Sequence, residues 1–230
     1  MSNRYVFLYA SAMVIIVALV LSTAATLLKP FQDRNVKIEK MQDILSTINI
    51  TAERDVAMQL FEQYIIESKV INHLGEEVEG VAFDIDLHVE NRKPVEERQL
   101  PVYIAEVEGT RYYIVPLRGT GLWGPLWGYI SFYSDLNKIA GANFDHAGET
   151  PGLGAEISDL PFQAQFQGKQ IFDQGGEFRS VRVVKGGANP DDPHAVDGIT
   201  GGTITSNGVS DMIFDGLQVY KPYFINKRSL

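Results

Sequence analysis

The sequence predicts an α+β protein, in which a single N-terminal transmembrane helix is followed by a mixed, largely antiparallel sheet domain with flanking helices. Residues 5–28 predict the transmembrane helix, because they contain no charged side chain. Two β-rich runs between residues 102 and 115, with a glycine-containing hairpin signal between them, predict the sheet. Apolar residues at helical spacing over 36–68 and 209–220 predict the flanking helices.

The apolar N-terminal run has two interpretations. It is long enough to cross a hydrocarbon core of about 30 Å. The alternative is a cleaved signal peptide, and Thr23-Ala24-Ala25 resembles a cleavage site. The run is longer than the apolar part of a usual signal peptide, which favours a retained anchor over residues 1–30.

The charges around this anchor favour a cytoplasmic location for the rest of the chain. Lys29, Arg34 and Lys37 follow the apolar run, whereas Arg4 alone precedes it. The positive-inside rule places the more basic flank in the cytoplasm.

Two further segments follow the anchor. Residues 31–68 are predicted to form a helical stalk or first packing layer, with a break near Asn49, and residues 69–230 form the main domain. Residues 81–87 alternate like a half-buried strand, and residues 127–133 are a further strand candidate. The same reasoning predicts an interrupted helix at 157–167 and a strand at 178–185.

Composition excludes several kinds of site. The 230-residue chain has a formal net charge of -9, which argues against nucleic-acid binding. The absence of cysteine excludes disulfides, thiol catalysis and cysteine-held metals. The four histidines have no metal-binding spacing, so no metal site and no catalytic residue are predicted.

A glycine- and threonine-rich stretch at residues 197–208 precedes the C-terminal helical pattern. Glycines allow backbone N–H groups to converge on a ligand, and a helix N-terminus favours an anion. The stretch is therefore either a phosphate site or an ordinary turn.

Two more glycine-rich stretches stand earlier in the chain. Residues 119–128 formally contain G-x-G-x-x-G, but a proline and a strand follow where a dinucleotide site needs a helix. The stretch is either a turn with core aromatics or a loop that lays a tryptophan beside a flat ligand. The sequence E-T-P-G-L-G at 149–154 is either a turn or a second ligand loop.

These three stretches carry a family resemblance. D-G-I-T-G-G-T-I-T, from Asp197, resembles the D-x-x-[ST]-G-[AGS]-T-x-[ST] signature at which flavin transferases attach FMN. Together with G-L-W-G-P-L-W-G at 121–128 and E-T-P-G-L-G at 149–154, it resembles the flavin-carrying C subunits of sodium-pumping NADH:quinone oxidoreductases. The threonine motif and E-T-P-G-L-G are also similar to those of the G subunit of Rnf complexes.

The resemblance implies a covalent FMN-binding site. It implies that Thr203 carries FMN on its hydroxyl, that Asp197 and Thr200 help the transferase to recognise the site, and that Gly201 and Gly202 keep it accessible. The remaining implied contacts divide between the phosphate and the isoalloxazine ring. Those near the phosphate are Thr205 and Ser206, and those around the ring are Leu122, Trp123, Glu149, Thr150 and Leu153.

The resemblance also implies a place in a membrane complex. It implies a covalent-FMN electron-transfer protein, incomplete as an enzyme by itself, that relays electrons from NADH toward ubiquinone in a reaction coupled to sodium export. The implied partners are the A, B, D, E and F subunits, especially B, D and E, and a flavin transferase. The implied location is the bacterial inner membrane, with the soluble domain in the periplasm. The alternatives are the Rnf G subunit and a cofactor-free membrane-anchored binding protein.

Overall fold

The computed structural model describes residues 3–228, so residues 1–2 and 229–230 of the predicted segments lie outside the described part of the chain. The chain divides into two compact units, Met1–Met41 and Gln42–Leu230. Each unit is described by itself.

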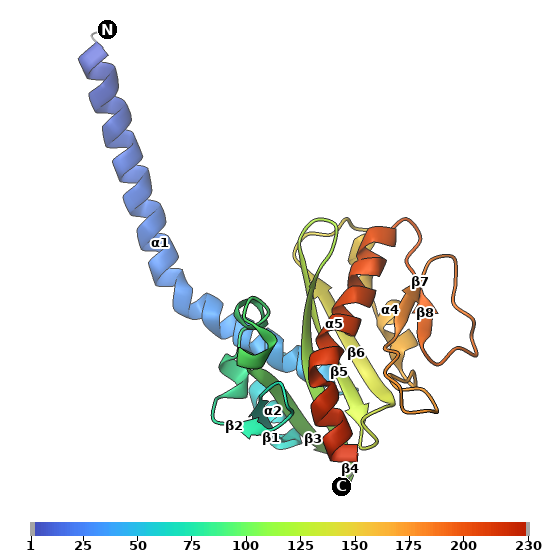
Figure 1. The fold of residues 1–230 in the computed structure, drawn as a ribbon. Coiled ribbons are helices and arrows are strands. Elements are labelled where there is room, and N and C mark those ends of the chain that lie inside the picture. The colour runs from blue at the N-terminus through green and yellow to red at the C-terminus, as the bar shows by residue number, and fades with distance from the viewer. Residues whose placement is uncertain (1–2, 229–230) are drawn as a thin grey trace. The chain divides into compact units, whose positions relative to one another are not determined.

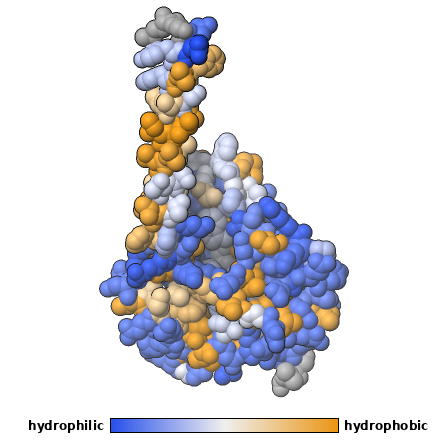
Figure 2. Space-filling model, turned by 90° about the vertical axis from the view of Figure 1, so that its left-hand side faces the viewer, coloured by the Kyte–Doolittle hydropathy of each residue, from blue (hydrophilic) through white to orange (hydrophobic). Residues whose placement is uncertain are grey.

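The first unit is most of the helix α1, Asn3–Ser46. Among the described residues, α1 is the helix that is long and apolar enough to cross a membrane, with a mean hydropathy of 2.4 over its most apolar stretch and none of that stretch buried. Figure 2 shows apolar side chains over its surface. These properties fit the predicted membrane anchor.

The second unit contains an antiparallel sheet with the strand order β2-β1-β3-β4-β5-β6. The strands are β1 (Ile65–Ile71), β2 (Glu77–Val78), β3 (Leu100–Val107), β4 (Thr110–Thr120), β5 (Pro125–Tyr133) and β6 (Ile139–His146). In Figure 1, α5 (Thr203–Arg228) lies across this sheet. The α+β fold with a largely antiparallel sheet is therefore confirmed.

The remaining elements are short. The helical turns are α2 (Ala57–Tyr64), η1 (Ala82–Asp84), α3 (Leu87–Glu90), η2 (Val95–Glu97), η3 (Gly154–Ser158), α4 (Leu160–Gln163) and η4 (Ala164–Phe166). The strands β7 (Arg182–Val184) and β8 (Ala195–Asp197) form a separate parallel pair. The core lies between the sheet, α5 and these elements, and includes fully buried Phe132, Phe144, Phe166, Ile213 and Phe224.

The predicted hairpin is confirmed between β3 and β4. Glu108 and Gly109 occupy its turn with φ of 50° and 78°. Positive φ at both central residues is the backbone of a type I′ turn, whose twist matches the flanking strands. The turn sets the register that pairs Val107 with Thr110 and Tyr103 with Ile114.

Two predictions in the first half of the second unit are wrong. Residues 65–68 were expected to be helical but begin β1, where Ser68 pairs with Tyr103. This pairing is long-range, so local helical spacing did not reveal it. Residues 81–87 were expected to form a strand, but they contain η1, and Val81 is 61% exposed. Alternation alone does not make a strand where no partner strand pairs with it.

The predictions for the last third are partly wrong. The expected helix at 157–167 is three short turns, and the expected strand at 178–185 is only β7. Strand β6 was not predicted. Helix α5 begins at Thr203, before the expected cap at Ser206-Asn207, and continues beyond the expected end at residue 220, through Pro222.

The last turn of α1 and the residue after it, Thr47, pack against the sheet. Ile44 and Leu45 are fully buried, and the hydroxyl of buried Ser131 on β5 donates a hydrogen bond of 2.6 Å to the Thr47 carbonyl. A Cβ at Gly141 would stand 2.3 Å from the same carbonyl oxygen, so this close approach requires glycine in β6.

Candidate functional site

The glycine- and threonine-rich stretch connects β8 to α5 and places Thr203 at the first position of the helix. The Ser206 N–H donates to the Gly202 carbonyl at 2.8 Å, which closes the first helical turn. The earlier N–H groups of a helix have no partner within the helix and carry its positive dipole end. Thr203 is half-buried, so its hydroxyl lies at a helix N-terminus that suits an anion.

Two glycines bring this loop against a second one. Gly201 has φ of +77°, and a Cβ there would lie 2.6 Å from the Leu153 Cδ2. Gly202 has an ordinary φ, but a Cβ would lie 3.0 Å from the Ile199 Cγ2 and 3.4 Å from the Gly154 nitrogen. The loop before Thr203 therefore packs directly on the E-T-P-G-L-G loop.

The two predicted recognition residues are exposed. Thr200 lies in the loop, and Asp197 ends β8. The Asp197 Oδ1 accepts a hydrogen bond from the Ala188 N–H at 2.7 Å, and the Asp197 N–H donates to the Gln165 Oε1 at 2.8 Å. Asp197 thus fixes the loop while its carboxylate remains at the surface.

The side chains of Thr205 and Ser206 are buried and already hydrogen-bonded. The Ser206 Oγ accepts from the Ile199 N–H at 3.1 Å, which ties the helix start to its own loop. The Thr205 Oγ1 donates to the Glu149 Oε2 at 2.6 Å. Their predicted contacts near a phosphate stay a prediction, since within the described residues these hydroxyls bond to protein groups.

Glu149 joins all three motifs. Only 5% of this residue is exposed. Its Oε1 accepts from the Trp123 N–H at 2.9 Å, and its Oε2 accepts from the Thr205 hydroxyl. The loop at residues 121–124, which we call the tryptophan loop, therefore meets the E-T-P-G-L-G loop and the first turn of α5 at one buried side chain.

An exposed apolar surface surrounds this junction. Its members come from the same three motifs, and we call them the apolar rim: Leu122 is 48% exposed, Trp123 68%, Leu153 40% and Ile204 58%. Thr150 is also exposed, while its carbonyl accepts from the Leu153 and Ala155 N–H groups. Exposed large side chains in one place are typical of a ligand or partner site.

The structure brings together most of the predicted site residues and adds one that was not predicted. Glu149 was expected around the ring, which stays a prediction; its buried carboxylate links two other loops. Ile204 was not predicted, although its position beside Thr203 places it on the rim. The sequence did offer a signal for Ile204, because it is an apolar residue within a run of glycine, threonine and serine residues.

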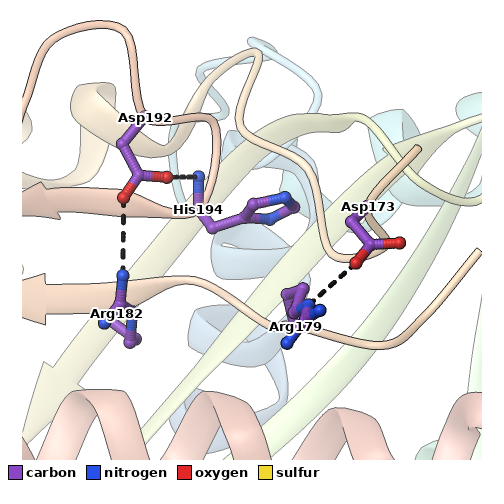
Figure 3. Close-up of a pocket in the computed structure, with 5 residues that line it drawn as sticks. All are labelled: Asp173, Arg179, Arg182, Asp192 and His194. Carbon is purple, nitrogen blue, oxygen red and sulfur yellow. Dashed lines mark hydrogen bonds and ion pairs between the residues drawn. The ribbon is translucent and has the colours of Figure 1, made fainter. Parts of the chain in front are cut away.

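A separate pocket of about 380 Å³ is lined by Asp173, Arg179, Arg182, Asp192 and His194 (Figure 3). Its charges are paired internally: the Arg179 Nε is 2.8 Å from the Asp173 Oδ2, and an Arg182 nitrogen is 3.4 Å from the Asp192 Oδ2. The hydrogen bond from Arg179 lowers the pKa of Asp173. None of the rim residues lines this pocket.

The residues between 3 and 228 contain no group of three or more histidine, aspartate or glutamate side chains suited to a metal ion. The donors around Thr203 are backbone N–H groups and hydroxyls, and its surroundings are apolar. This combination fits a phosphate joined to a flat apolar ring.

Comparison with known proteins assigns the family. The family model described as FMN-binding domain matches residues 121–218, which include all three motifs. The chain is 31% identical over 212 residues to the C subunit of the Na(+)-translocating NADH-quinone reductase of Vibrio vulnificus YJ016, covering 85% of this chain and 83% of that protein. It is 40% identical over 121 residues to the corresponding C subunit of Pseudomonas aeruginosa PAO1, covering 51% and 46%.

Solved structures agree with this assignment. The crystal structure of the C subunit of the Na(+)-translocating NADH-quinone reductase from Parabacteroides distasonis ATCC 8503 matches with a TM-score of 0.80 and 48% identity, covering 86% of this chain and 96% of that one. The structure of Shewanella oneidensis NqrC matches with a TM-score of 0.74 and 25% identity, covering 85% and 100%. The chain therefore belongs to the family of Na(+)-translocating NADH-quinone reductase C subunits.

Proposed function

We propose that this chain is the membrane-anchored, electron-transferring C subunit of a Na(+)-translocating NADH-quinone reductase, and that it holds FMN covalently through the Thr203 hydroxyl. The observation that supports this proposal is the convergence of three loops on the first turn of α5. The convergence puts the one half-buried threonine hydroxyl of the signature next to the apolar rim.

The start of α5 suits the phosphate of FMN. A phosphoryl group esterified to Thr203 would face the unpaired N–H groups of the first turn of a 26-residue helix. Interaction with the positive end of a helix dipole stabilises an anion by about 0.3–1 kcal/mol at an exposed site. Gly201 and Gly202 add no side chain of their own next to this hydroxyl.

The apolar rim suits the ring of FMN. Covering Trp123, Leu153 and Ile204 with a flat ring removes apolar surface from water and allows offset stacking on the indole. Bound FMN supplies the electron-transfer chemistry, whereas the protein fixes its position and its electrostatic surroundings. A covalent link keeps the cofactor in place even where the rim leaves part of it open to solvent.

The proposal extends to partners and location. The A, B, D, E and F subunits of the complex would supply the NADH, quinone and sodium sites, with B, D and E as the nearest partners. A flavin transferase would attach FMN, for which exposed Asp197 and Thr200 are accessible recognition groups. We place the anchor in the bacterial inner membrane and the second unit in the periplasm.

The mass of the denatured protein tests the covalent link. In cells that contain the flavin transferase, the wild-type chain should gain the mass of FMN minus water. Thr203→Ala should remain unmodified because it lacks the esterified oxygen. Thr203→Ser is the matched control, since it keeps a hydroxyl at the first helical position.

Two results would contradict the proposal. An unmodified wild-type chain from a host with an active transferase would favour a cofactor-free binding protein. A modified Thr203→Ala chain would place the link on another residue. The proteins that purify with the wild-type chain provide a separate test. The other quinone-reductase subunits would support the proposal, whereas a ferredoxin-dependent complex would indicate the similar Rnf protein.

A further inference from the structure

Glu149 has an unusual environment for a carboxylate. It is 5% exposed, and its two oxygens accept hydrogen bonds from groups 26 and 56 residues away in the sequence, the Trp123 N–H and the Thr205 hydroxyl. The ion pairs among the described residues do not include Glu149. Its charge is therefore stabilised by two neutral donors rather than by a cation.

The neighbouring backbone leaves room for this carboxylate. A Cβ at Gly121 would lie 2.5 Å from the Glu149 Oε1, and a Cβ at Gly154 would lie 2.6 Å from the Oε2 and 2.4 Å from the Thr205 Oγ1. Two loops thus carry glycine where a side chain would displace the Glu149–Thr205 pair. This is a built arrangement and not a chance surface contact.

We propose that Glu149 is a positioning residue for the flavin site: its carboxylate holds the tryptophan loop to the first turn of α5, and its buried negative charge lowers the reduction potential of the flavin. This inference rests on the proposed FMN site. It assigns Glu149 a role through Trp123 and Thr205 and through its field, without a direct contact to the ring.

The two parts of the role have different physical causes. Holding the loops requires two acceptor oxygens, because the Trp123 N–H and the Thr205 hydroxyl both donate. Lowering the potential requires the charge, because an added electron makes the flavin more negative and a nearby negative charge opposes this. A charge in a weakly solvated site acts more strongly than one at the surface.

Four variants separate these causes. Glu149→Gln keeps the shape and one acceptor, and its amide can donate to the Thr205 oxygen, but it removes the charge. Glu149→Ala removes both the acceptor oxygens and the charge. Thr205→Val keeps the charge and loses one hydrogen bond. Glu156→Gln is the matched control, since Glu156 lies on η3, seven residues along from Glu149, and is exposed.

The first readout needs no flavin. In a Thr203→Ala background, amide hydrogen exchange at Trp123 reports whether its N–H is held. We expect exchange to accelerate about tenfold or more in Glu149→Ala and to stay within about threefold of the parent in Glu149→Gln and Glu156→Gln. Equal exchange in all variants would show that Glu149 does not hold this loop.

The second readout is the midpoint potential of the loaded protein, with loading checked by mass. We expect Glu149→Gln to favour one-electron reduction about tenfold, which is a rise of about 59 mV. Glu156→Gln should shift it by less than a third of this, and Thr205→Val should not raise it. An equal rise in Glu149→Gln and Glu156→Gln, or in Glu149→Gln and Thr205→Val, would overturn the electrostatic role.

The two proposals fail in different ways. If the wild-type chain acquires no FMN in a transferase-containing host, the proposed function is wrong, and the hydrogen-exchange comparison still decides whether Glu149 holds the loops. If the wild-type chain is loaded but neither readout responds to Glu149→Gln or Glu149→Ala, the FMN site stands and the role of Glu149 is wrong.

Discussion

At three positions around Thr203, a missing side chain makes room for atoms of another loop. Gly121 leaves room for the Glu149 carboxylate, Gly154 for the Thr205 hydroxyl, and Gly201 for the Leu153 methyl group. Each imagined Cβ would come within 2.6 Å of its neighbour. A side chain at any of these positions would force neighbouring atoms to shift, and at Gly201 the positive φ adds backbone strain.

Burial of the Tyr223 side chain lowers the stability of the folded protein in a different way. Its hydroxyl is buried and, within residues 3–228, has no hydrogen-bond partner. Burial also raises the pKa of Tyr223 to about 12, from 10.0. Burial likewise raises the pKa of Tyr129 and of Tyr220 well above the usual value.

These tyrosines predict a loss of stability in alkali. Above pH 10.0 the unfolded chain releases tyrosine protons that the folded chain retains up to about pH 12. The contribution of these tyrosines to the free energy of unfolding is therefore constant below this window and falls within it. Urea unfolding at about pH 9 and about pH 11 measures the loss. Equal midpoints at both pH values would contradict the prediction.

Tyr223→Phe tests the contribution of one hydroxyl. Removing an unpaired buried hydroxyl should raise the free energy of unfolding at neutral pH by about 1 kcal/mol. The variant should also lose less stability between about pH 9 and about pH 11, because one titrating group is gone. A destabilised variant at neutral pH would indicate a partner for the Tyr223 hydroxyl.

The sequence predicted some of these residue-scale features and not others. Thr203 was identified through a signature, and the structure places it at a helix start beside the other two motifs. The bonding of Glu149 was not predicted, because a carboxylate in a glycine-rich loop is ordinarily solvated. Its two donors lie in other loops, and only the folded chain brings them within 2.9 Å.

At the scale of elements, the contact between α5 and β4 positions Thr203. A Cβ at Gly208 would lie 2.4 Å from the Thr120 carbonyl oxygen, and one at Gly119 would lie 2.6 Å from the Met212 Cβ. Glycine on both elements lets the helix approach the strand closely. The first turns of α5 therefore lie beside the end of β4, which leads into the tryptophan loop.

Gly208→Ala and Gly216→Ala test this contact. Alanine favours an exposed helix by about 1 kcal/mol over glycine. At Gly208, however, the new methyl group meets backbone, and we expect a net loss of about 1–3 kcal/mol in unfolding free energy. At Gly216 it meets the Leu117 Cδ2, 2.6 Å away at the end of a flexible side chain, so the loss should be smaller.

Thermal or urea unfolding measures both changes. If Gly208→Ala is no less stable than Gly216→Ala, the helix and strand do not approach as closely as described. In the protein loaded with FMN, Gly208→Ala should also disturb the flavin environment more than Gly216→Ala does, because Gly208 lies nearer to Thr203 along the helix.

Elements were predictable where the local signal and the long-range pairing agree. The β3–β4 hairpin is an example, because its turn residues and both strands are contiguous. The first four residues of β1, 65–68, were assigned to a helix because their apolar spacing fits both structures and the partner strand, β3, begins about 30 residues later. Strand β6 was not recognised because it contains Gly141 and glycine is depleted in strands; the need for that glycine comes from the Thr47 carbonyl.

At the scale of the whole molecule, the charges beside the anchor and the proposed function favour opposite topologies. Lys29, Arg34 and Lys37 outnumber Arg4, so the charge bias favours a cytoplasmic second unit. The proposed function places that unit in the periplasm. Partner proteins in a membrane complex can fix the topology of one anchor against the charge bias of its own chain.

A single introduced thiol tests the topology, since the chain contains no cysteine. Ser134 is exposed and precedes β6, away from the three motifs. In intact cells with a permeable outer membrane, Ser134→Cys should react with a membrane-impermeant maleimide as fully as after lysis. The wild-type chain is the control for background labelling. Labelling only after lysis would place the second unit in the cytoplasm.

The link between Glu149 and Thr205 also bears on the order of events during synthesis. A ribosome makes the tryptophan loop and the E-T-P-G-L-G loop before it makes α5. Until then, the Glu149 carboxylate lacks one of its two donors, and the threonine that would accept FMN does not exist. A chain interrupted before α5 thus has neither the acceptor hydroxyl nor a completed site, so cofactor attachment would serve as a mark of finished synthesis.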